Sequence, residues 1–286
     1  MITVNNLTYT YPKASSETLH GLSFTIAEQE IFGFLGPSGA GKSTTQNILI
    51  GLLKHYGGEV QVMGQEIGAW GQELYEHIGI CFELPNHYLK LTALENLAHF
   101  ASLYSGETLD PMEVLVWVNL KDDADKKVEA FSKGMKIRLN VARSIIHRPK
   151  LLFLDEPTTG LDPVNARNIK DLVLRLRGQG TTVFVTTHDM MVADELCDRV
   201  AFITGGNIDV IDAPNTLKKQ HGKRVIAVEY QNGAREPGRQ EFPLDGLGDN
   251  QSFISLLKSA SRLETVHTQE TTLENIFIEV TGQELS

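Results

Sequence analysis

One stretch limits the fold of this 286-residue chain more than any other: residues 30–44, EIFGFLGPSGAGKST. Its first six residues are almost all apolar, which is typical of a strand buried on both faces of a parallel sheet. Residues 36–44 then fit the pattern G-x-x-x-x-G-K-[ST] directly after the expected strand. Glycines let such a loop wrap closely around phosphate groups, whose charge is bound by successive N–H groups and by the start of the next helix. The stretch therefore predicts a phosphate-binding loop between a buried strand and a helix.

Two positions of this loop have specific expected roles in binding a nucleotide. We expect Lys42 to reach the β- and γ-phosphates, and the hydroxyl of Ser43 to ligate Mg²⁺. The remaining loop residues contribute mainly through their backbone. The expected nucleotide-binding residues of the loop are Gly36, Pro37, Ser38, Gly39, Ala40, Gly41, Lys42, Ser43 and Thr44.

Two further apolar runs indicate a parallel sheet around this loop. Residues 151–154 (LLFL) and 181–187 (TTVFVTT) have the same buried-strand character as the first run. Between them, residues 164–177 carry apolar side chains at helical spacing and are followed by Gly178, a helix stop. Strand, helix and strand in this order predict a right-handed crossover in a parallel sheet.

Polar side chains follow both runs directly. Asp155 and Glu156 come after the first run, and His188 comes after the second. Ligands of open parallel sheets bind beyond the carboxyl ends of the strands, where the phosphate loop also lies. We expect Asp155 to hold Mg²⁺, directly or through water, and Glu156 to accept a proton from the attacking water. His188 is expected to donate a hydrogen bond to the γ-phosphate or to orient the water.

Composition narrows the class of protein. The net charge is −10 and the pI about 5.4, so the chain lacks the basic character of proteins that bind polyanions nonspecifically. Cys81 and Cys197 have no metal-ligand spacing and are expected to be reduced thiols of a cytosolic protein. The N-terminus has no export signal, and no apolar stretch is long enough to span a membrane.

The rest of the chain suggests smaller structural parts. Residues 2–11 and 21–26 are expected strands, and residues 199–212 are an expected hairpin around Gly205-Gly206-Asn207. The region from about 83 to 127 is more helical and is expected to be an inserted subdomain. After residue 212 the sequence pattern changes to one typical of a small α+β domain. Its expected elements are a strand in RVIAVEY and helices at 251–259 and 272–280.

A second helix start with anion-binding character lies in residues 131–135, FSKGM. Ser132 precedes an apolar-periodic run, as expected of a helix N-cap. The free N–H groups of a helix start can bind an anion. Taken alone, this stretch is better explained as a serine cap on an amphipathic helix.

Together, these motifs resemble the nucleotide-binding subunit of an ATP-binding cassette (ABC) transporter, of bacterial drug-exporter type. The resemblance covers residues 2–220, with all motifs in the order of that family. It implies an α/β fold: a P-loop NTPase parallel-sheet core with an N-terminal antiparallel β subdomain and an inserted helical subdomain at about 83–130. A small C-terminal α+β extension is expected over 221–286, after the ABC ATP-binding domain, 1–220.

The resemblance also assigns roles that the residues alone do not. Tyr11 matches the aromatic residue that stacks on adenine, although Tyr9 is an equal candidate. In this family two subunits bind head to tail, so Ser132 and the N–H of Gly134 are expected to contact the ATP held by the partner subunit. Residues 160–162, Gly-Leu-Asp, match the loop that contacts the partner, and His188 matches the switch histidine.

Three residues depart from the common pattern of the family. Lys133 and Met135 replace a glycine and a glutamine of the common Leu-Ser-Gly-Gly-Gln motif, while Ser132 is kept. Glu83 stands where a glutamine that touches Mg²⁺ is usual. We expect Glu83 to remain a ligand on the Mg²⁺ side, because carboxylate oxygens suit that ion.

The resemblance therefore implies an ATPase that uses ATP and Mg²⁺ at a shared dimer interface, either a homodimer or a pair with a second ABC ATPase subunit. It implies a separate transmembrane permease subunit, a position on the cytoplasmic face of the membrane, and export. No nucleic-acid partner is expected. Two alternatives are a soluble ABC ATPase acting on ribosomes or DNA and a regulator that does not hydrolyse ATP. The single cassette, the absence of heptads and the charge of −10 disfavour the first, and Asp155, Glu156 and His188 disfavour the second.

Overall fold

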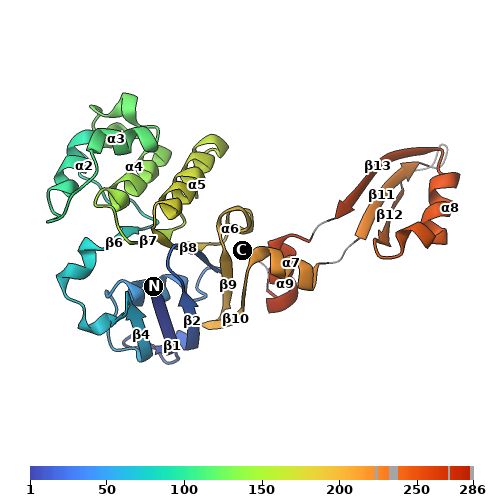
Figure 1. The fold of residues 1–286 in the computed structure, drawn as a ribbon, viewed down its shortest axis with the longest axis horizontal. Helices are drawn as coiled ribbons and strands as arrows, with labels where there is room; N and C mark the ends of the chain where they lie inside the picture. The colour runs from blue at the N-terminus through green and yellow to red at the C-terminus, as the bar shows by residue number, and fades with distance from the viewer. Residues whose placement is uncertain (223–224, 232–237, 270, 284–286) are drawn as a thin grey trace. The chain divides into compact units, whose positions relative to one another are not determined.

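The computed structural model describes residues 1–222, 225–231, 238–269 and 271–283, and Figure 1 shows its ribbon. The chain forms two compact units, Met1–Ala213 and Pro214–Gln283. The second unit begins with helix α7 (Pro214–His221), which packs on helix α9 (Leu273–Thr281). The sequence places the end of the first domain at residue 220, in the last turn of that helix.

A six-stranded sheet forms the centre of the first unit, in the order β10-β9-β3-β8-β7-β6. All neighbouring pairs are parallel except β9 and β10, which form the predicted antiparallel hairpin. Its strands carry fully buried aromatic side chains whose rings contact one another, namely Phe32, Phe153 and Phe184. Burial of these strands explains the nearly continuous apolar runs in the sequence. The strands are β3 (Ile31–Leu35), β6 (Ile78–Cys81), β7 (Leu151–Asp155), β8 (Thr182–Thr187), β9 (Arg199–Thr204) and β10 (Asn207–Asp212).

An antiparallel sheet, in the order β2-β1-β4-β5, shares a hydrophobic core with the central sheet. The sequence predicts its first two strands. It gives no clear signal for the other two, because they are short and carry exposed polar residues. The strands are β1 (Ile2–Tyr9), β2 (Leu19–Ile26), β4 (Gly57–Val62) and β5 (Gln65–Glu66).

Helices complete the first unit. Helix α1 (Lys42–Leu49) follows the glycine-rich loop, and α5 (Pro163–Gly178) connects β7 to β8 as predicted. Helices α2 (Ala93–Ala101) and α3 (Pro111–Trp117) lie in the expected helical subdomain, and α4 (Lys133–Ile145), which begins after its expected end at about 130, packs on both. The remaining helical segments are α6 (Met190–Leu196) and the 3₁₀ turns Ile67–Ala69, Gln72–Glu76, Lys121–Asp123 and Val128–Ala130.

The second unit contains a three-stranded antiparallel sheet in the order β12-β11-β13. Helix α8 (Gln251–Ser259) covers part of one face, where Val228, Phe242 and Leu256 are buried together. The predicted strand and both predicted helices are confirmed within the described residues. The strands are β11 (Val225–Gln231), β12 (Gly238–Pro243) and β13 (Arg262–Gln269), and a 3₁₀ turn spans Leu247–Asp249.

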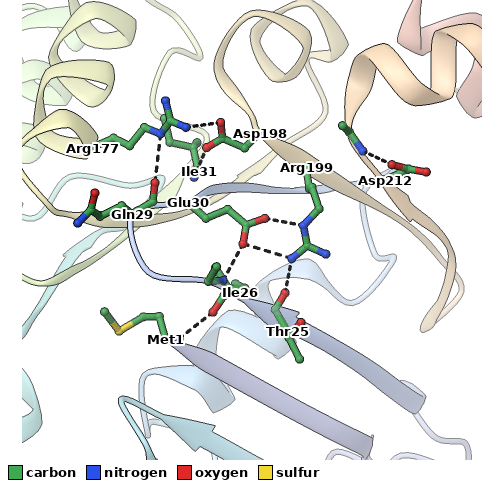
Figure 2. A network of polar contacts seen from close by, with 12 residues as sticks. Met1, Thr25, Ile26, Gln29, Glu30, Ile31, Arg177, Asp198, Arg199 and Asp212 are labelled. Atoms are coloured by element: carbon green, nitrogen blue, oxygen red, sulfur yellow. Dashed lines mark hydrogen bonds and ion pairs between the residues drawn. The ribbon is translucent and has the colours of Figure 1, made fainter.

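A network of ion pairs and hydrogen bonds joins the two sheets of the first unit (Figure 2). Arg199 binds both carboxylate oxygens of Glu30, at 2.6 and 3.2 Å, and also donates to the backbone oxygen of Thr25. Arg177 likewise binds Asp198, whose other oxygen accepts from the N–H of Ile31. Because Ile31 and Arg199 begin β3 and β9, the network holds the amino ends of the strands, opposite the glycine-rich loop.

Candidate functional site

A cavity of about 450 Å³ lies at the carboxyl ends of the central strands. Its walls carry Lys42 from the glycine-rich loop, Asp155 and Glu156 from the end of β7, and His188 from the end of β8. The structure therefore brings together four side chains that the sequence predicts at one site. Because β7 and β8 are paired neighbours, the residues that follow them are held side by side.

The glycine-rich loop has the close backbone approach that its sequence predicts. A Cβ atom at Gly36 would lie 2.1 Å from the carbonyl oxygen of Ile203, and Gly41 has a φ of 110°. Both positions therefore require glycine. Ser38, Gly39, Gly41, Lys42, Ser43 and Thr44 line the cavity, whereas Gly36, Pro37 and Ala40, which are also described, are not among the lining residues.

Lys42 is held at the centre of this loop. Its ammonium group donates to the carbonyl oxygens of Gly36, at 2.6 Å, and Pro37, at 2.9 Å. An ammonium group has three donors, so one remains for a phosphate oxygen. Burial lowers the pKa of Lys42 from its ordinary value, and the carboxylates of Glu156 and Asp155 oppose that shift. The site therefore combines a desolvated cation with nearby negative charge.

Asp155 lines the cavity and is partly buried. The hydroxyl of Thr186, from the neighbouring strand, donates a hydrogen bond to its carboxylate. Burial raises the pKa of Asp155, and the charges of Glu156 and Glu83 raise it further, against the opposing effects of Thr186 and Lys42. An added cation at this position would relieve the unfavourable charge.

The oxygen donors here suit Mg²⁺. The Ser43 hydroxyl and the carboxylates of Asp155 and Glu83 all line the cavity. Mg²⁺ prefers such hard oxygens and usually combines one or two carboxylates with phosphate oxygens and water. Within the described part of the chain, no three His, Cys, Asp or Glu residues cluster closely enough to hold a metal by themselves. The residues therefore fit an ion that arrives with a nucleotide.

Glu156 is the most firmly fixed side chain of the site. Its φ of 48° is unusual for a residue other than glycine. One carboxylate oxygen accepts from Nδ1 of His188, at 2.7 Å, and from the His188 backbone N–H, at 3.0 Å. The other accepts from the hydroxyls of Thr159 and Thr187, at 3.0 and 3.1 Å. Strain and four donors together set the direction of this carboxylate.

The pairing of Glu156 with His188 is a contact that the sequence does not predict. The Glu156 side chain is 9 % exposed and that of His188 is 53 % exposed, so the histidine ring covers the carboxylate from the solvent side. An ionised carboxylate only accepts hydrogen bonds, so Nδ1 carries the proton in this pair. Nε2 of His188 is then the ring nitrogen left for a ligand. The supporting threonines were also not predicted, although TTVFVTT ends in two polar residues that are fully buried.

The structure distinguishes the two tyrosines near the loop. Tyr9 is 6 % exposed and belongs to the hydrophobic core. Tyr11 is 39 % exposed, lines the cavity, and its hydroxyl lies 3.1 Å from the hydroxyl of Thr44. Its ring meets that of Tyr9 edge to face at 5.0 Å. Of the two, only Tyr11 is among the residues that line the cavity.

Ser132 caps helix α4, as the sequence predicts, with its hydroxyl accepting from the N–H of Met135. Ser132 and Gly134, both described, are not among the residues that line the cavity. Instead, the helix start borders residues 160–162. A Cβ atom at Gly134 would lie 3.4 Å from Leu161, and one at Gly160 would lie 3.3 Å from the end of the Lys133 side chain.

Comparison with known proteins decides the family. A model of the ABC transporter family matches residues 19–159. A fluoroquinolones export ATP-binding protein of Mycobacterium tuberculosis is 53 % identical over 286 residues, covering 100 % of this chain and 95 % of that protein. The chain belongs to the ABC transporter family. It is an ATP-binding subunit whose hydrolysis of ATP drives transport.

Other comparisons extend this assignment over both units. An uncharacterised ABC transporter ATP-binding protein of Bacillus subtilis, YhcH, is 42 % identical over 275 residues, covering 92 % of this ABC subunit and 90 % of that protein. A model of the fluoroquinolone efflux ABC transporter C-terminal domain matches residues 224–270. In the described residues we find no helix that combines the length and apolar character needed to cross a membrane.

The fold agrees with solved cassettes. A dimeric post-hydrolysis state of the ATP-binding cassette MJ0796, bound to ADP and Pi, superimposes with a TM-score of 0.68 at 30 % identity. The match covers 74 % of this ABC subunit and 98 % of that chain. The predicted ABC cassette fold is therefore confirmed, including its antiparallel β subdomain and its parallel core sheet.

Proposed function

We propose that this subunit binds ATP and Mg²⁺ at a head-to-tail dimer interface and powers export of a fluoroquinolone-like compound through a separate transmembrane subunit. The observation that carries the catalytic part is the convergence of Lys42, Asp155, Glu156 and His188 on one cavity. The proposed substrate class rests on the name of the M. tuberculosis relative, which is similar over the whole chain.

Each side chain has a proposed part in hydrolysis. Lys42 binds the terminal phosphates with the donor that its two carbonyl partners leave free. Glu156 accepts the proton of the attacking water, because its carboxylate is oriented by Thr159, Thr187 and His188. His188 stabilises the transferring phosphoryl group through Nε2 or orients the water.

We propose that Ser43, Asp155 and Glu83 hold Mg²⁺. When bound, the ion neutralises charge on the phosphates. Tyr11, which lines the same cavity, stacks on the base. Residues 36–44 bind the phosphates through their N–H groups.

The second half of each site comes from a partner in this proposal. Ser132 and Gly134 start a helix that is exposed at its N-terminus and lies outside the cavity of its own chain. Such a helix start suits the γ-phosphate of an ATP held by another subunit. The partner is a second copy of this chain or a different ABC ATPase subunit, and MJ0796 itself has been solved as a dimer.

A second cavity is the candidate docking site for a membrane partner. It measures about 460 Å³ and lies between β6 and the helical subdomain. The rings of Tyr75, Tyr88 and Phe100 line it, and the Arg143 guanidinium lies 4.7 Å from the centre of the Phe100 ring. We propose that a cytoplasmic segment of the permease docks here, which places the subunit on the cytoplasmic face of the membrane.

The test separates hydrolysis from transport. Glu156→Gln should lower the ATP turnover of the purified chain by about 10²–10⁴-fold, because it removes a general base. Cells that express the chain with its membrane partner should accumulate less fluoroquinolone than cells with Glu156→Gln in the same pair. Equal turnover in both proteins would refute the catalytic role, and equal accumulation despite lost turnover would refute the substrate class.

A further inference from the structure

The strand β13 forms one edge of the sheet in the second unit. Its only strand partner among the described residues is β11, on one side, as Figure 1 also shows. An edge strand presents unpaired N–H and C=O groups, which can pair with a strand of another chain. The edge is eight residues long, RLETVHTQ, which is longer than the five to six residues of an average strand.

The two edges of this sheet differ in how they are protected. The strand β12 ends at Pro243, which has no N–H to donate. The strand β13 contains neither proline nor lysine, the residues that most often block an edge. Its pairing with β11 is irregular only near Leu263, so residues 265–268 remain regular. Of the two edge strands of this sheet that the structure describes, β13 is therefore the one that carries neither proline nor lysine.

Apolar side chains lie on this edge. Val266 pairs with Val228, which is fully buried in the face under α8. Val266 itself is 46 % exposed, and Leu263 is 41 % exposed. The apolar face thus continues past the region that α8 covers, and its outermost residues lack cover within the described unit.

We propose that β13 pairs antiparallel with β13 of a second copy of this chain, around a two-fold axis at Val266. The two three-stranded sheets then become one continuous sheet. This proposal rests on the proposed function in one respect: the ATP-bound pair of subunits supplies the second copy.

Backbone geometry restricts the register. In antiparallel sheets, residues directly opposite are either both hydrogen-bonded or both not. A strand can therefore meet its own copy only with one residue facing itself. Centring on Thr265 places Glu264 opposite the apolar Val266, and centring on His267 places two histidines opposite each other. Centring on Val266 instead pairs two valines on the apolar face and places Thr265 opposite His267, where the two side chains can hydrogen-bond.

Cysteine cross-linking of the full chain tests this register. Opposed residues have Cα atoms about 4.5–5.5 Å apart, which is within the range of a disulfide. Val266→Cys should therefore form a covalent dimer when the protein is treated with copper phenanthroline in the presence of MgATP, which supplies the paired subunits. Thr265→Cys is the matched control, because Thr265 faces His267 and its own copy is a diagonal neighbour about 7–8 Å away. The native Cys81 and Cys197 are buried and should give little background.

The expected result is a covalent dimer with Val266→Cys and little or none with Thr265→Cys. Cross-linking of neither variant, or of both to the same extent, would overturn the proposal. ATP turnover of both variants is measured in parallel. Normal turnover without cross-linking refutes the β13 interface and leaves the proposed function intact. Cross-linking of a chain that lacks turnover supports the interface and refutes the ATPase assignment.

Discussion

The ion pair between Glu30 and Arg199 allows a quantitative prediction of stability. The Glu30 side chain is 8 % exposed, and its carboxylate accepts from Ala27 N–H at 2.7 Å and from two guanidinium nitrogens of Arg199. In Glu30→Gln the amide NH₂ must replace one of these oxygens. Whichever way the amide is turned, its NH₂ group faces another hydrogen-bond donor: the Ala27 N–H in one orientation, and the Arg199 guanidinium in the other.

The magnitude follows from these contacts. Breaking a buried ion pair costs about 3–5 kcal/mol. Arg199 is 35 % exposed, so water can solvate it after the substitution, and we expect a loss of about 2–3 kcal/mol in the free energy of unfolding of the first unit. For a unit of this size, each kcal/mol lowers Tm by roughly 2–4 °C, which gives a decrease of about 4–12 °C.

Thermal unfolding followed by circular dichroism measures this change. Glu17→Gln is the matched control, because Glu17 is half exposed and pairs with His20, itself exposed, at 3.4 Å. Its effect should stay within about 0.5 kcal/mol. Equal Tm values for Glu30→Gln and Glu17→Gln would refute the reasoning. ATP turnover of Glu30→Gln at a temperature well below its Tm should be normal, because the pair lies at the opposite ends of the strands from the cavity.

Three further predictions concern the site and the buried histidines. Gly36→Ala should weaken ATP binding by at least tenfold in a titration of nucleotide fluorescence, because the new methyl group overlaps the carbonyl oxygen of Ile203; unchanged affinity would contradict the loop geometry. Asp155→Asn should raise the urea midpoint at pH 7 while abolishing Mg²⁺-dependent turnover. The pKa of Asp155 is raised in the folded chain. Its contribution to the free energy of unfolding is therefore most favourable below the unfolded pKa and is lost as pH rises through the folded pKa. A urea midpoint at pH 7 that Asp155→Asn leaves unchanged would argue against this. Burial lowers the pKa of both His87 and His147 to about 4, so the stability that they provide is present above their unfolded pKa of 6.5 and is lost as pH falls towards 4. Urea midpoints between pH 7 and 4 test this, and replacing His147 by Gln should flatten the decrease.

The central part of the fold follows from local patterns in the sequence. The runs 31–35, 151–154 and 182–187 are apolar because their strands are covered on both faces, and this pattern does not depend on knowing the neighbours of each strand. Polar residues directly after these runs lie at the same edge of a parallel sheet, which is why Asp155, Glu156 and His188 were predicted together.

The contacts within the site could not be predicted in the same way. The hydrogen bond between Glu156 and His188 depends on β7 and β8 being neighbours, and this order is set by packing of the whole sheet. The choice between Tyr9 and Tyr11 depends on where β1 ends, because Tyr9 still points into the core. The strand β5 has only two residues, and β4 and β12 are largely polar, so no local signal distinguishes them from loops.

The central claim is that ATP binds between two subunits, with the helix start at Ser132 completing the site of the partner. Light scattering of the Glu156→Gln chain, with and without MgATP, tests it most directly, because this variant should bind ATP without hydrolysing it. The double variant Glu156→Gln, Ser132→Arg is the control, since its long cationic side chain blocks the helix start. The account predicts a change from monomer to dimer on adding MgATP for Glu156→Gln alone. A dimer of both variants, or a Glu156→Gln monomer that remains monomeric with ATP bound, would contradict a shared site made by two copies of this chain.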